Sequence, residues 1–161
     1  MTHKRQLTAC FTGHRKIRPG EESRLRERVE QELRALILQG YDTFITGGAL
    51  GFDTLAQQVV LGLRQEFPYI RSFMAIPCED QDKLWAPEDR AVYRSLVKAA
   101  DACSVLSPVY TPICMRERNR FMVDHSSCCI AYYDGNPRSG TGSTVRYARE
   151  QNVPVVNLYG E

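Results

Sequence analysis

Residues 46–53, which read Thr-Gly-Gly-Ala-Leu-Gly-Phe-Asp, form a glycine-rich segment. An apolar run over 41–45 precedes it, and apolar residues spaced three and four apart follow it over 52–63, a pattern that predicts a strand, a turn and a helix. Glycines let a backbone approach a ligand closely, and the first turn of a helix offers unpaired N–H groups to an anion. The segment therefore predicts a nucleotide- or phosphate-binding loop, the alternative being a tight turn that merely needs positive φ. Its candidate ligand-binding residues are Gly47, Gly48, Ala49, Gly51 and Asp53.

A second loop with similar chemistry occupies residues 139–144 and opens a helix predicted over 142–151. Backbone N–H groups and hydroxyls are the donors that a phosphate needs. Serine and threonine also cap helices that bind nothing, so an N-capping loop is the alternative. Because two such loops follow two different strands, we favour ligand binding. The candidates here are Ser139, Gly140, Thr141, Gly142, Ser143 and Thr144.

The first predicted strand also ends in polar residues, Thr12, Gly13, His14 and Arg15, and repeats the Thr-Gly pair that ends the second strand. In open parallel sheets ligands bind at the carboxyl ends of the strands, where both turns would lie. Arg15 suits pairing with a phosphate, and His14 suits a ribose hydroxyl or acid–base work. Simple solvation is the interpretation we favour for His14 taken alone.

Arginines gather in the helix predicted over 115–126. Arg116 and Arg120 share one helical face, whereas Arg118 and Asn119 lie near enough to the start of the helix to reach the edge of the sheet. We expect Arg118 to pair with an anion, the alternative being a solvated basic face. Elsewhere in the chain, Trp85 or Tyr93 is expected to stack on a base.

Two common phosphate-binding motifs are absent from the glycine-rich segment. No Gly-Lys-Ser/Thr follows it, so it is not a Walker A loop, and it lacks the G-x-G-x-x-G spacing of the dinucleotide fingerprint. Asp53 falls in the first turn of the predicted helix, where it either complements the helix dipole or binds a ligand hydroxyl.

Length and composition predict one globular domain over residues 1–161. No apolar run reaches the roughly 18 residues of a membrane span, and the polar N-terminus lacks a signal sequence, so we expect a cytoplasmic protein without a membrane partner. The net charge of +2 gives no general argument for nucleic-acid binding.

The six cysteines lack the paired spacing of a zinc site, and we expect no metal. Four of them, Cys10, Cys103, Cys128 and Cys129, lie inside apolar runs. We interpret the cysteines as buried, reduced thiols that act as small hydrophobic side chains.

Strands and helices alternate throughout the chain. This pattern predicts an α/β fold, a Rossmann-like, doubly wound and mostly parallel sheet flanked by helices, in a single domain. Strands are predicted over 7–12, 41–45, 71–76, 103–106, 128–133 and 153–159, and helices over 21–39, 52–63, 87–100, 115–126 and 142–151. In the helix over 87–100 the predicted inward residues are Ala91, Val92, Leu96, Val97 and Ala100.

Taken together, these motifs resemble the YpsA-like branch of the SLOG superfamily, which is named for the Smf/DprA DNA-processing proteins and the LOG cytokinin-activating enzymes. The resemblance covers nearly the whole chain, and its motifs fall in order. They are Thr12–Arg15, Gly47–Asp53, Pro77 with Gln81 and Trp85, Tyr93, Ala100–Asp101, Arg118–Asp124, Tyr133–Gly135 and Gly140–Val145. The resemblance implies a Rossmann-like fold and a pocket for a nucleotide or a nucleotide-derived ligand.

LOG enzymes cleave the N-glycosidic bond of nucleoside monophosphates and release ribose 5-phosphate. Residues 115–122 are similar to their M-H-x-R-K-x-x-M motif and place Arg118 at its functional arginine. Residues 138–146 are similar to their P-G-G-x-G-T-x-x-E motif, but Arg146 stands where the family has a glutamate. A developing oxocarbenium ion or an attacking water wants a negative or basic group, which arginine cannot supply.

The leading hypothesis is a protein that binds a nucleotide, NAD or an ADP-ribose-type ligand, with Asp134 among the binding residues. The first alternative is a LOG-like phosphoribohydrolase, in which Asp53, Asp134 or Glu150 replaces the missing carboxylate and Arg118 takes part in catalysis. The second alternative, by analogy with DprA, is binding of single-stranded nucleic acid. Kinship with LOG enzymes also raises the prospect of a homodimer.

Overall fold

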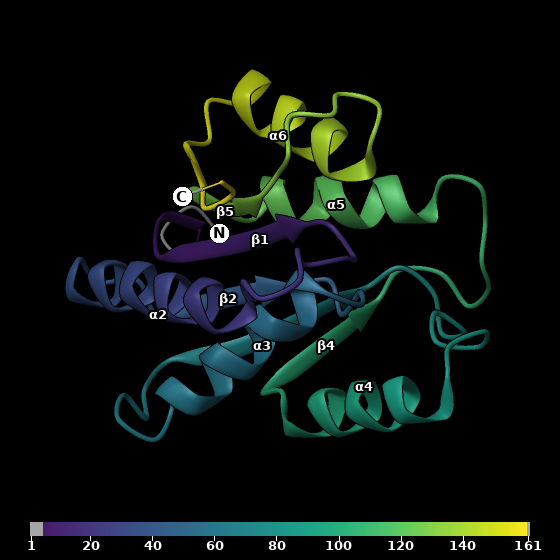
Figure 1. The fold of residues 1–161 in the computed structure, drawn as a ribbon, viewed down its shortest axis with the longest axis horizontal. Coiled ribbons are helices and arrows are strands. Elements are labelled where there is room, and N and C mark those ends of the chain that lie inside the picture. Colours follow the sequence, from purple (N-terminus) through teal and green to yellow (C-terminus); the bar gives the residue numbers. More distant parts are fainter. Residues whose placement is uncertain (1–4, 161) are drawn as a thin grey trace.

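The computed structural model describes residues 5–160 and contains one parallel sheet with helices on both faces (Figure 1). Its elements follow one another as β1 (Thr8–Gly13), α2 (Glu22–Leu38), β2 (Thr43–Thr46), α3 (Phe52–Leu63), β3 (Arg71–Ile76), α4 (Pro87–Ala99), β4 (Ala102–Val105), α5 (Cys114–Asp124), β5 (Cys128–Tyr132), α6 (Gly140–Glu150) and β6 (Val155–Asn157).

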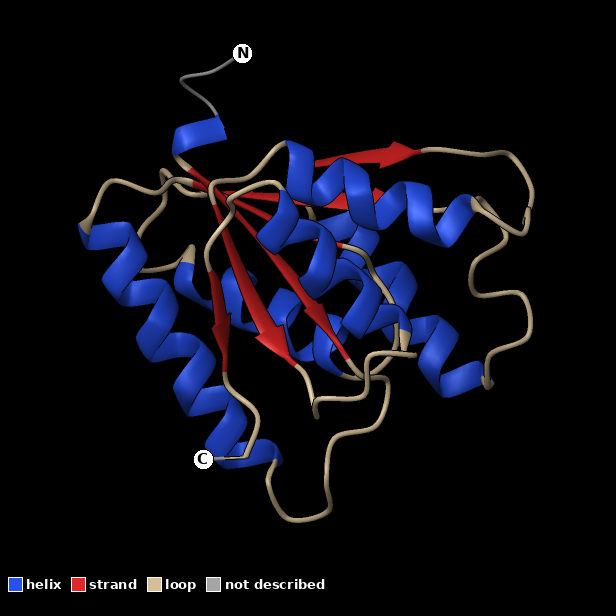
Figure 2. Cartoon of the chain, turned by 90° about the horizontal axis from the view of Figure 1, so that it is seen from above, coloured by secondary structure: helices blue, strands red, loops and turns tan. Residues whose placement is uncertain are grey.

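The six strands within residues 5–160 lie in the order β4-β3-β2-β1-β5-β6, and every pair is parallel. Figure 2 shows them fanning out with their arrowheads toward the same edge. The chain builds outward from β1 to β4 and then returns to the other side of β1 with β5. The switch in strand order therefore lies between β1 and β5, where open α/β sheets bind ligands. The predicted Rossmann-like α/β fold is confirmed.

Two apolar clusters hold the helices against the two faces of the sheet. On one face α2 and α3 cover Phe11 and Phe44, because alternate residues of each strand point to the same side, and Phe52 of α3 packs among them. On the other face α5 and α6 pack over Cys10 and Ile45. Burial on both faces explains why the central strands are apolar runs without polar alternation.

A buried polar network also ties α3 to the sheet. Gln57 is fully buried, accepts a hydrogen bond from the hydroxyl of Thr46 at 3.0 Å and donates one to the hydroxyl of Ser72 at 2.5 Å. The helix thereby fixes the end of β2, where the glycine-rich segment begins, against β3. The expected apolar stripe of α3 is present, but the periodicity gave no sign of this glutamine.

Two of the residues predicted to face inward in α4 are exposed instead. In α4 the inward residues are Tyr93 and Leu96, which pack with Met74 and Ile76, whereas Ala91 and Val92 are exposed. The ring of Tyr93 packs on the sheet, and its hydroxyl accepts a hydrogen bond from the side-chain amide of Gln81 in the loop after β3.

Cys103 is exposed, because its strand, β4, lies at the edge of the sheet. The other five cysteines are buried, and all six are free thiols. Within residues 5–160, no helix is both long and apolar enough to cross a membrane.

Candidate functional site

A cleft of about 270 Å³ lies at the carboxyl ends of β1 and β2, beside the start of α6. We call it the carboxyl-edge cleft. It is lined by Phe11, Thr12, Gly13, His14, Arg15, Ala49, Asp53, Met115, Arg118, Asn119, Met122, Ser139, Gly140 and Thr141. Residues from four regions that the sequence singled out separately therefore meet in one place, at the switch in strand order.

The loops after β1 and β2 pack directly against each other. Gly51 has a φ of 80°, and a Cβ added there would overlap the backbone of Arg15. The N–H of Phe52 donates a hydrogen bond to the carbonyl of His14 at 3.1 Å. A Cβ on Gly13 would in turn overlap the side chain of Phe52. The glycines at 13 and 51 thus allow a close approach that any larger residue would prevent.

Arg118 is 4% exposed and reaches from α5 to the glycine-rich segment. Its Nη1 donates to the carbonyl of Gly47 at 2.5 Å, and its Nε donates to Oδ1 of Asn119 at 2.8 Å. A Cβ on Gly47 would overlap the guanidinium. The solvated basic face considered for this helix does not apply to Arg118, although Arg116 and Arg120 are exposed.

Asp53 is the charge that faces Arg118 in this buried region. It is 5% exposed, and its Oδ2 accepts a hydrogen bond from the N–H of Ala49 at 3.2 Å. Burial raises the pKa of the Asp53 carboxyl, against the opposing effects of Arg118 and the Ala49 N–H. Burial likewise lowers the pKa of Arg118, and Asp53 opposes that shift. Each charge therefore offsets part of the cost of burying the other.

The start of α6 forms another wall of the cleft. The hydroxyl of Ser139 accepts a hydrogen bond from the N–H of Gly142 at 2.9 Å, so Ser139 is the N-cap, and the helix begins two residues before its predicted start. No residue within 5–160 accepts from the N–H groups of Gly140 or Thr141. The same loop thus caps α6 and lines the cleft. It leaves the N–H groups of Gly140 and Thr141 without partners, at the positive end of the helix dipole.

His14 joins the loops that follow β1 and β5. Its Nε2 lies 3.0 Å from Oδ1 of Asp134 and 3.0 Å from the Asp134 backbone N–H. A neutral imidazole accepts from that N–H at Nε2, whereas a protonated one donates to the carboxylate. The N–H of Asn136 lowers the pKa of Asp134, partial burial opposes it, and His14 lowers it further.

Several predicted residues lie near the cleft without lining it. Gly48, with a φ of 71°, rests against Tyr93 and Gln81, and Trp85 meets Tyr93 edge-on at 5.1 Å between ring centroids. Tyr93 is buried, and its hydroxyl is within hydrogen-bond distance of the Gln81 amide at 3.3 Å. These aromatic residues therefore pack against the glycine-rich segment on the side away from the cleft.

The remaining predicted residues also lie off the lining. Glu150 is exposed at the last residue of α6, and Asp134 holds His14 from outside the cleft. Ser143 and Thr144 line an adjoining cavity between α5 and α6. Conversely, sequence reasoning missed the apolar lining residues Phe11, Met115 and Met122, whose types signal only a core.

The model of the YpsA family, described as the YspA SLOG family, matches residues 12–158. The chain belongs to the YpsA family of SLOG proteins. The resemblance seen in the motifs is thereby confirmed.

Among its relatives, the chain is 34% identical over 119 residues to YoqJ, an uncharacterized SPbeta prophage-derived protein of Bacillus subtilis, covering 66% of this chain and 69% of that one. It is 22% identical over 137 residues to the UPF0398 protein YpsA of the same organism, covering 81% of this chain and 76% of the relative.

Solved structures of DNA processing protein A share this fold. The protein from Streptococcus pneumoniae aligns with a TM-score of 0.67 and 18% identity, over 97% of this chain and 51% of that one. The protein from Helicobacter pylori aligns with a TM-score of 0.64 and 20% identity, over 92% of this chain and 63% of that one. This SLOG chain therefore matches about half to two thirds of each neighbour, at an identity that shows the fold alone.

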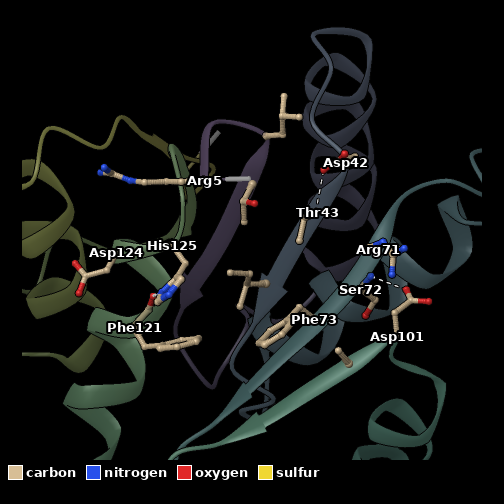
Figure 3. Close-up of a pocket in the computed structure, with 14 residues that line it drawn as sticks. Arg5, Asp42, Thr43, Arg71, Ser72, Phe73, Asp101, Phe121, Asp124 and His125 are labelled. Carbon is tan, nitrogen blue, oxygen red and sulfur yellow. Dashed lines mark hydrogen bonds between the residues drawn. The ribbon is translucent and has the colours of Figure 1, made fainter. Parts of the chain in front are cut away.

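A larger cavity, about 790 Å³, lies at the opposite edge of the sheet, where the strands begin. We call it the amino-edge cavity. It is lined by Arg5, Leu7, Thr8, Asp42, Thr43, Ile45, Arg71, Ser72, Phe73, Asp101, Ala102, Phe121, Asp124 and His125. Figure 3 shows Phe73 and Phe121 side by side, with Asp124 and His125 on the α5 side and Asp101 on the β4 side.

Much of the charge around the amino-edge cavity has internal partners. Asp101 accepts from Arg64 at 3.0 Å and from the N–H of Ser72 at 2.7 Å. Asp124 accepts from the hydroxyl of Tyr147 at 2.6 Å, and Arg5 donates to the carbonyl of Ser126 at 3.2 Å. The lining combines carboxylates and cations with apolar side chains, and this mixture of charges does not favour binding of an anion.

Proposed function

We propose that the carboxyl-edge cleft binds a nucleotide or a nucleotide derivative through its phosphate. The observation that carries the proposal is the guanidinium of Arg118, which lines the cleft although it is almost fully buried. Gly47 and Asn119 hold its Nη1 and Nε, whereas Nη2 has no hydrogen bond to any residue within 5–160. A guanidinium whose Nη1 and Nε are held by the protein and whose Nη2 has no partner is well placed to bind an oxyanion.

The surroundings of Arg118 support the same ligand class. The two unpaired N–H groups at the start of α6 are donors for phosphate oxygens, and Arg15 adds an exposed positive charge. Asp53 offsets part of the cost of burying the charge of Arg118, so the guanidinium stays charged in the free protein, ready for an anion. The apolar side chains of Met115 and Met122 would lie against the less polar part of the ligand.

Isothermal titration calorimetry of the whole chain with AMP, ADP, NAD and ADP-ribose tests the proposal, with adenosine as the ligand without phosphate. We expect AMP to bind at least about tenfold more tightly than adenosine, because the phosphate supplies the charge-assisted hydrogen bonds. If none of the four phosphorylated ligands binds to protein that circular dichroism shows to be folded, the proposal is overturned.

Variants identify the residues that hold the phosphate. Arg118→Lys keeps the positive charge but loses the guanidinium fork, and we expect AMP affinity to fall about 10- to 100-fold. Arg15→Ala removes an exposed side chain, so folding is unaffected and affinity falls about fivefold. Arg149→Ala, at the opposite end of α6, is the matched control and leaves affinity unchanged. Equal losses in all three variants would contradict phosphate binding at this cleft.

A second candidate function is cleavage of a nucleotide N-glycosidic bond, which the position of Asp53 favours. Among the described residues that line the cleft, Asp53 is the one carboxylate. Burial raises its pKa, and a carboxyl with a raised pKa suits proton transfer near neutral pH. Arg146, in contrast, is exposed on α6, as expected for a residue that replaces the LOG glutamate without its role.

Incubation with AMP, followed by chromatography for free adenine, decides between binding and cleavage. An enzyme releases adenine, and Asp53→Asn abolishes the release while AMP still binds. Absence of adenine from wild-type protein that binds AMP leaves the chain a binding protein.

The same binding experiments also test single-stranded nucleic acid as the ligand. The solved protein from Helicobacter pylori has a single-stranded DNA binding mode, and its likeness to this chain extends to the fold. If this chain bound such strands through their backbone, affinity for oligo(dT) would fall steeply with salt concentration. Retention of oligo(dT) without any affinity for mononucleotides would favour that function over nucleotide binding.

A further inference from the structure

The carboxyl-edge cleft continues into a second cavity, of about 210 Å³, between α5 and α6. Met115, Asn119 and Gly140 line both hollows and therefore lie at their junction. We call the second hollow the α5–α6 groove. The two volumes together reach the range of small-molecule binding sites, whereas the cleft alone falls slightly below it.

Positive charge dominates the α5–α6 groove. Arg116 and Arg120 project into it from successive turns of α5, and Ser143 adds a hydroxyl from α6. No carboxylate is among its lining residues within 5–160. The guanidinium of Arg116 has no ion pair or hydrogen bond to any residue in that range, so it is available to a ligand.

Tyr147, on the α6 side of the groove, positions Arg120. Its guanidinium lies 4.7 Å from the ring centre of Tyr147, and the hydroxyl of Tyr147 donates to Asp124 at 2.6 Å. Asp124, one turn beyond Arg120 on α5, thus accepts a hydrogen bond from the tyrosine, and no ion pair joins it to Arg120 within residues 5–160. Stacking on the ring restrains the arginine and leaves its N–H edge free to bind an anion.

The free protein holds these arginines at an electrostatic cost. Arg116 and Arg120 lie within the first two turns of α5, near the positive end of its dipole, and only Glu117 among the residues between them is acidic. Like charges four residues apart on a helix repel, which applies to Arg116 and Arg120. A bound anion relieves both effects, so this arrangement favours an occupied groove.

We propose that the α5–α6 groove receives a second phosphate group of the ligand whose first phosphate lies against Arg118 and the start of α6. The ligand class is then a nucleotide with two phosphate groups, joined either as a pyrophosphate or through a phosphodiester. This inference rests on the proposed nucleotide binding and adds that a mononucleotide fills only half of the site.

AMP and ADP-ribose make a matched pair of probes, because each carries about two negative charges at pH 7.5, on one phosphate in AMP and on two in ADP-ribose. We expect ADP-ribose to bind about 10- to 100-fold more tightly by calorimetry. In Arg116→Ala/Arg120→Ala that advantage disappears, whereas AMP affinity changes less than about twofold, because both side chains are exposed and lie beyond the first phosphate. Arg149→Ala is the control for lost positive charge and keeps the advantage.

The dinucleotide pdTpdT distinguishes a phosphodiester from a pyrophosphate as the linkage that the site prefers. The inference is overturned if ADP-ribose and pdTpdT bind no more tightly than AMP, or if the double variant weakens AMP by the same factor as the longer ligands. In both cases AMP binding itself persists and the proposed function stands. If AMP, ADP-ribose and pdTpdT all fail to bind, the proposed function fails and the inference falls with it.

Discussion

The carboxyl-edge cleft and the amino-edge cavity lie at opposite ends of the same strands, and the larger of the two is not the one that the motifs line. The larger cavity arises where helices leave part of the sheet uncovered, and much of its charge is paired within the protein. The smaller cleft is made by loops. A buried arginine and the N–H groups at the start of α6 leave hydrogen-bond donors there without partners in the protein. Unused donors, rather than volume, are what recognise a ligand.

The two regions also differ in how closely their backbones approach. At the carboxyl edge, Gly13, Gly47 and Gly51 bring main chain and side chains into contact that a Cβ would prevent. The amino-edge cavity is lined by no glycine among the described residues, and its base is a pair of stacked rings, Phe73 and Phe121, 6.4 Å apart. Substitutions at the carboxyl edge should therefore cost stability through backbone clashes, and substitutions around the amino-edge cavity through lost side-chain packing.

The largest expected effect is that of Gly51→Ala. The substitution places a Cβ against the backbone of Arg15 at a φ of 80°, and neither the strand end nor the helix start can move away. We expect a loss of more than about 3 kcal/mol in the free energy of unfolding, from the left-handed conformation and the clash together. Urea denaturation measures the loss.

Gly62→Ala is the matched control for that variant. Gly62 lies inside α3, with no atom within 4 Å of the position of an added Cβ and without positive φ. Alanine there should stabilise the protein by up to about 1 kcal/mol, because it restricts the unfolded chain and favours the helix. Similar unfolding midpoints for the two variants would show that the loops are not packed as described.

Phe73→Ala tests the amino-edge cavity. Truncation removes the stacking on Phe121 and part of the apolar cluster beneath α5, and we expect a loss of about 2 kcal/mol, since the ring is only partly buried. AMP affinity, measured by calorimetry, should stay within about twofold of wild type. Arg71→Ala removes a charge from the same cavity and should likewise leave AMP affinity unchanged. A large loss of affinity in either variant would move the binding site to the amino edge.

Some of the site was predictable because it depends on residue type and order. Glycines and hydroxyl residues that follow apolar strands predicted loops at the carboxyl edge, and parallel strands bring such loops together. The alternation of elements predicted the fold for a similar reason, since strand and helix periodicities are local properties of the chain.

The remainder depends on partners distant in the sequence. The burial of Asp53 and Arg118 follows from their meeting at Gly47, 71 residues from Arg118, and the burial of Gln57 follows from hydroxyls on two strands. Periodicity marks all three as polar and hence exposed. The prediction for α4 failed for a different reason. Ala91 and Val92 are apolar but smaller than Tyr93, and the helix packs Tyr93 against the sheet in their place.

The smallest expected effect concerns pH and Asp134. Its pKa is lowered in the folded protein, so the ionised carboxylate stabilises the fold above the unfolded pKa of about 3.9, and that stabilisation is lost as pH falls through the folded value. Asp134→Asn keeps an oxygen for the Asn136 N–H but cannot ionise, so its stability should fall less than that of wild type between about pH 5 and pH 2. Urea midpoints over this range measure the difference.

Glu27→Gln provides the comparison for Asp134→Asn, because Glu27 is exposed on α2 and forms no ion pair within residues 5–160. It should follow the wild-type profile. Since His14 and Asp134 join the two loops of the carboxyl edge, amide hydrogen exchange in acid should also accelerate first at residues 13–15 and 133–136, and later at the strand starts around the amino-edge cavity. Simultaneous acceleration at both edges would mean that the loops of the cleft open only with the whole sheet.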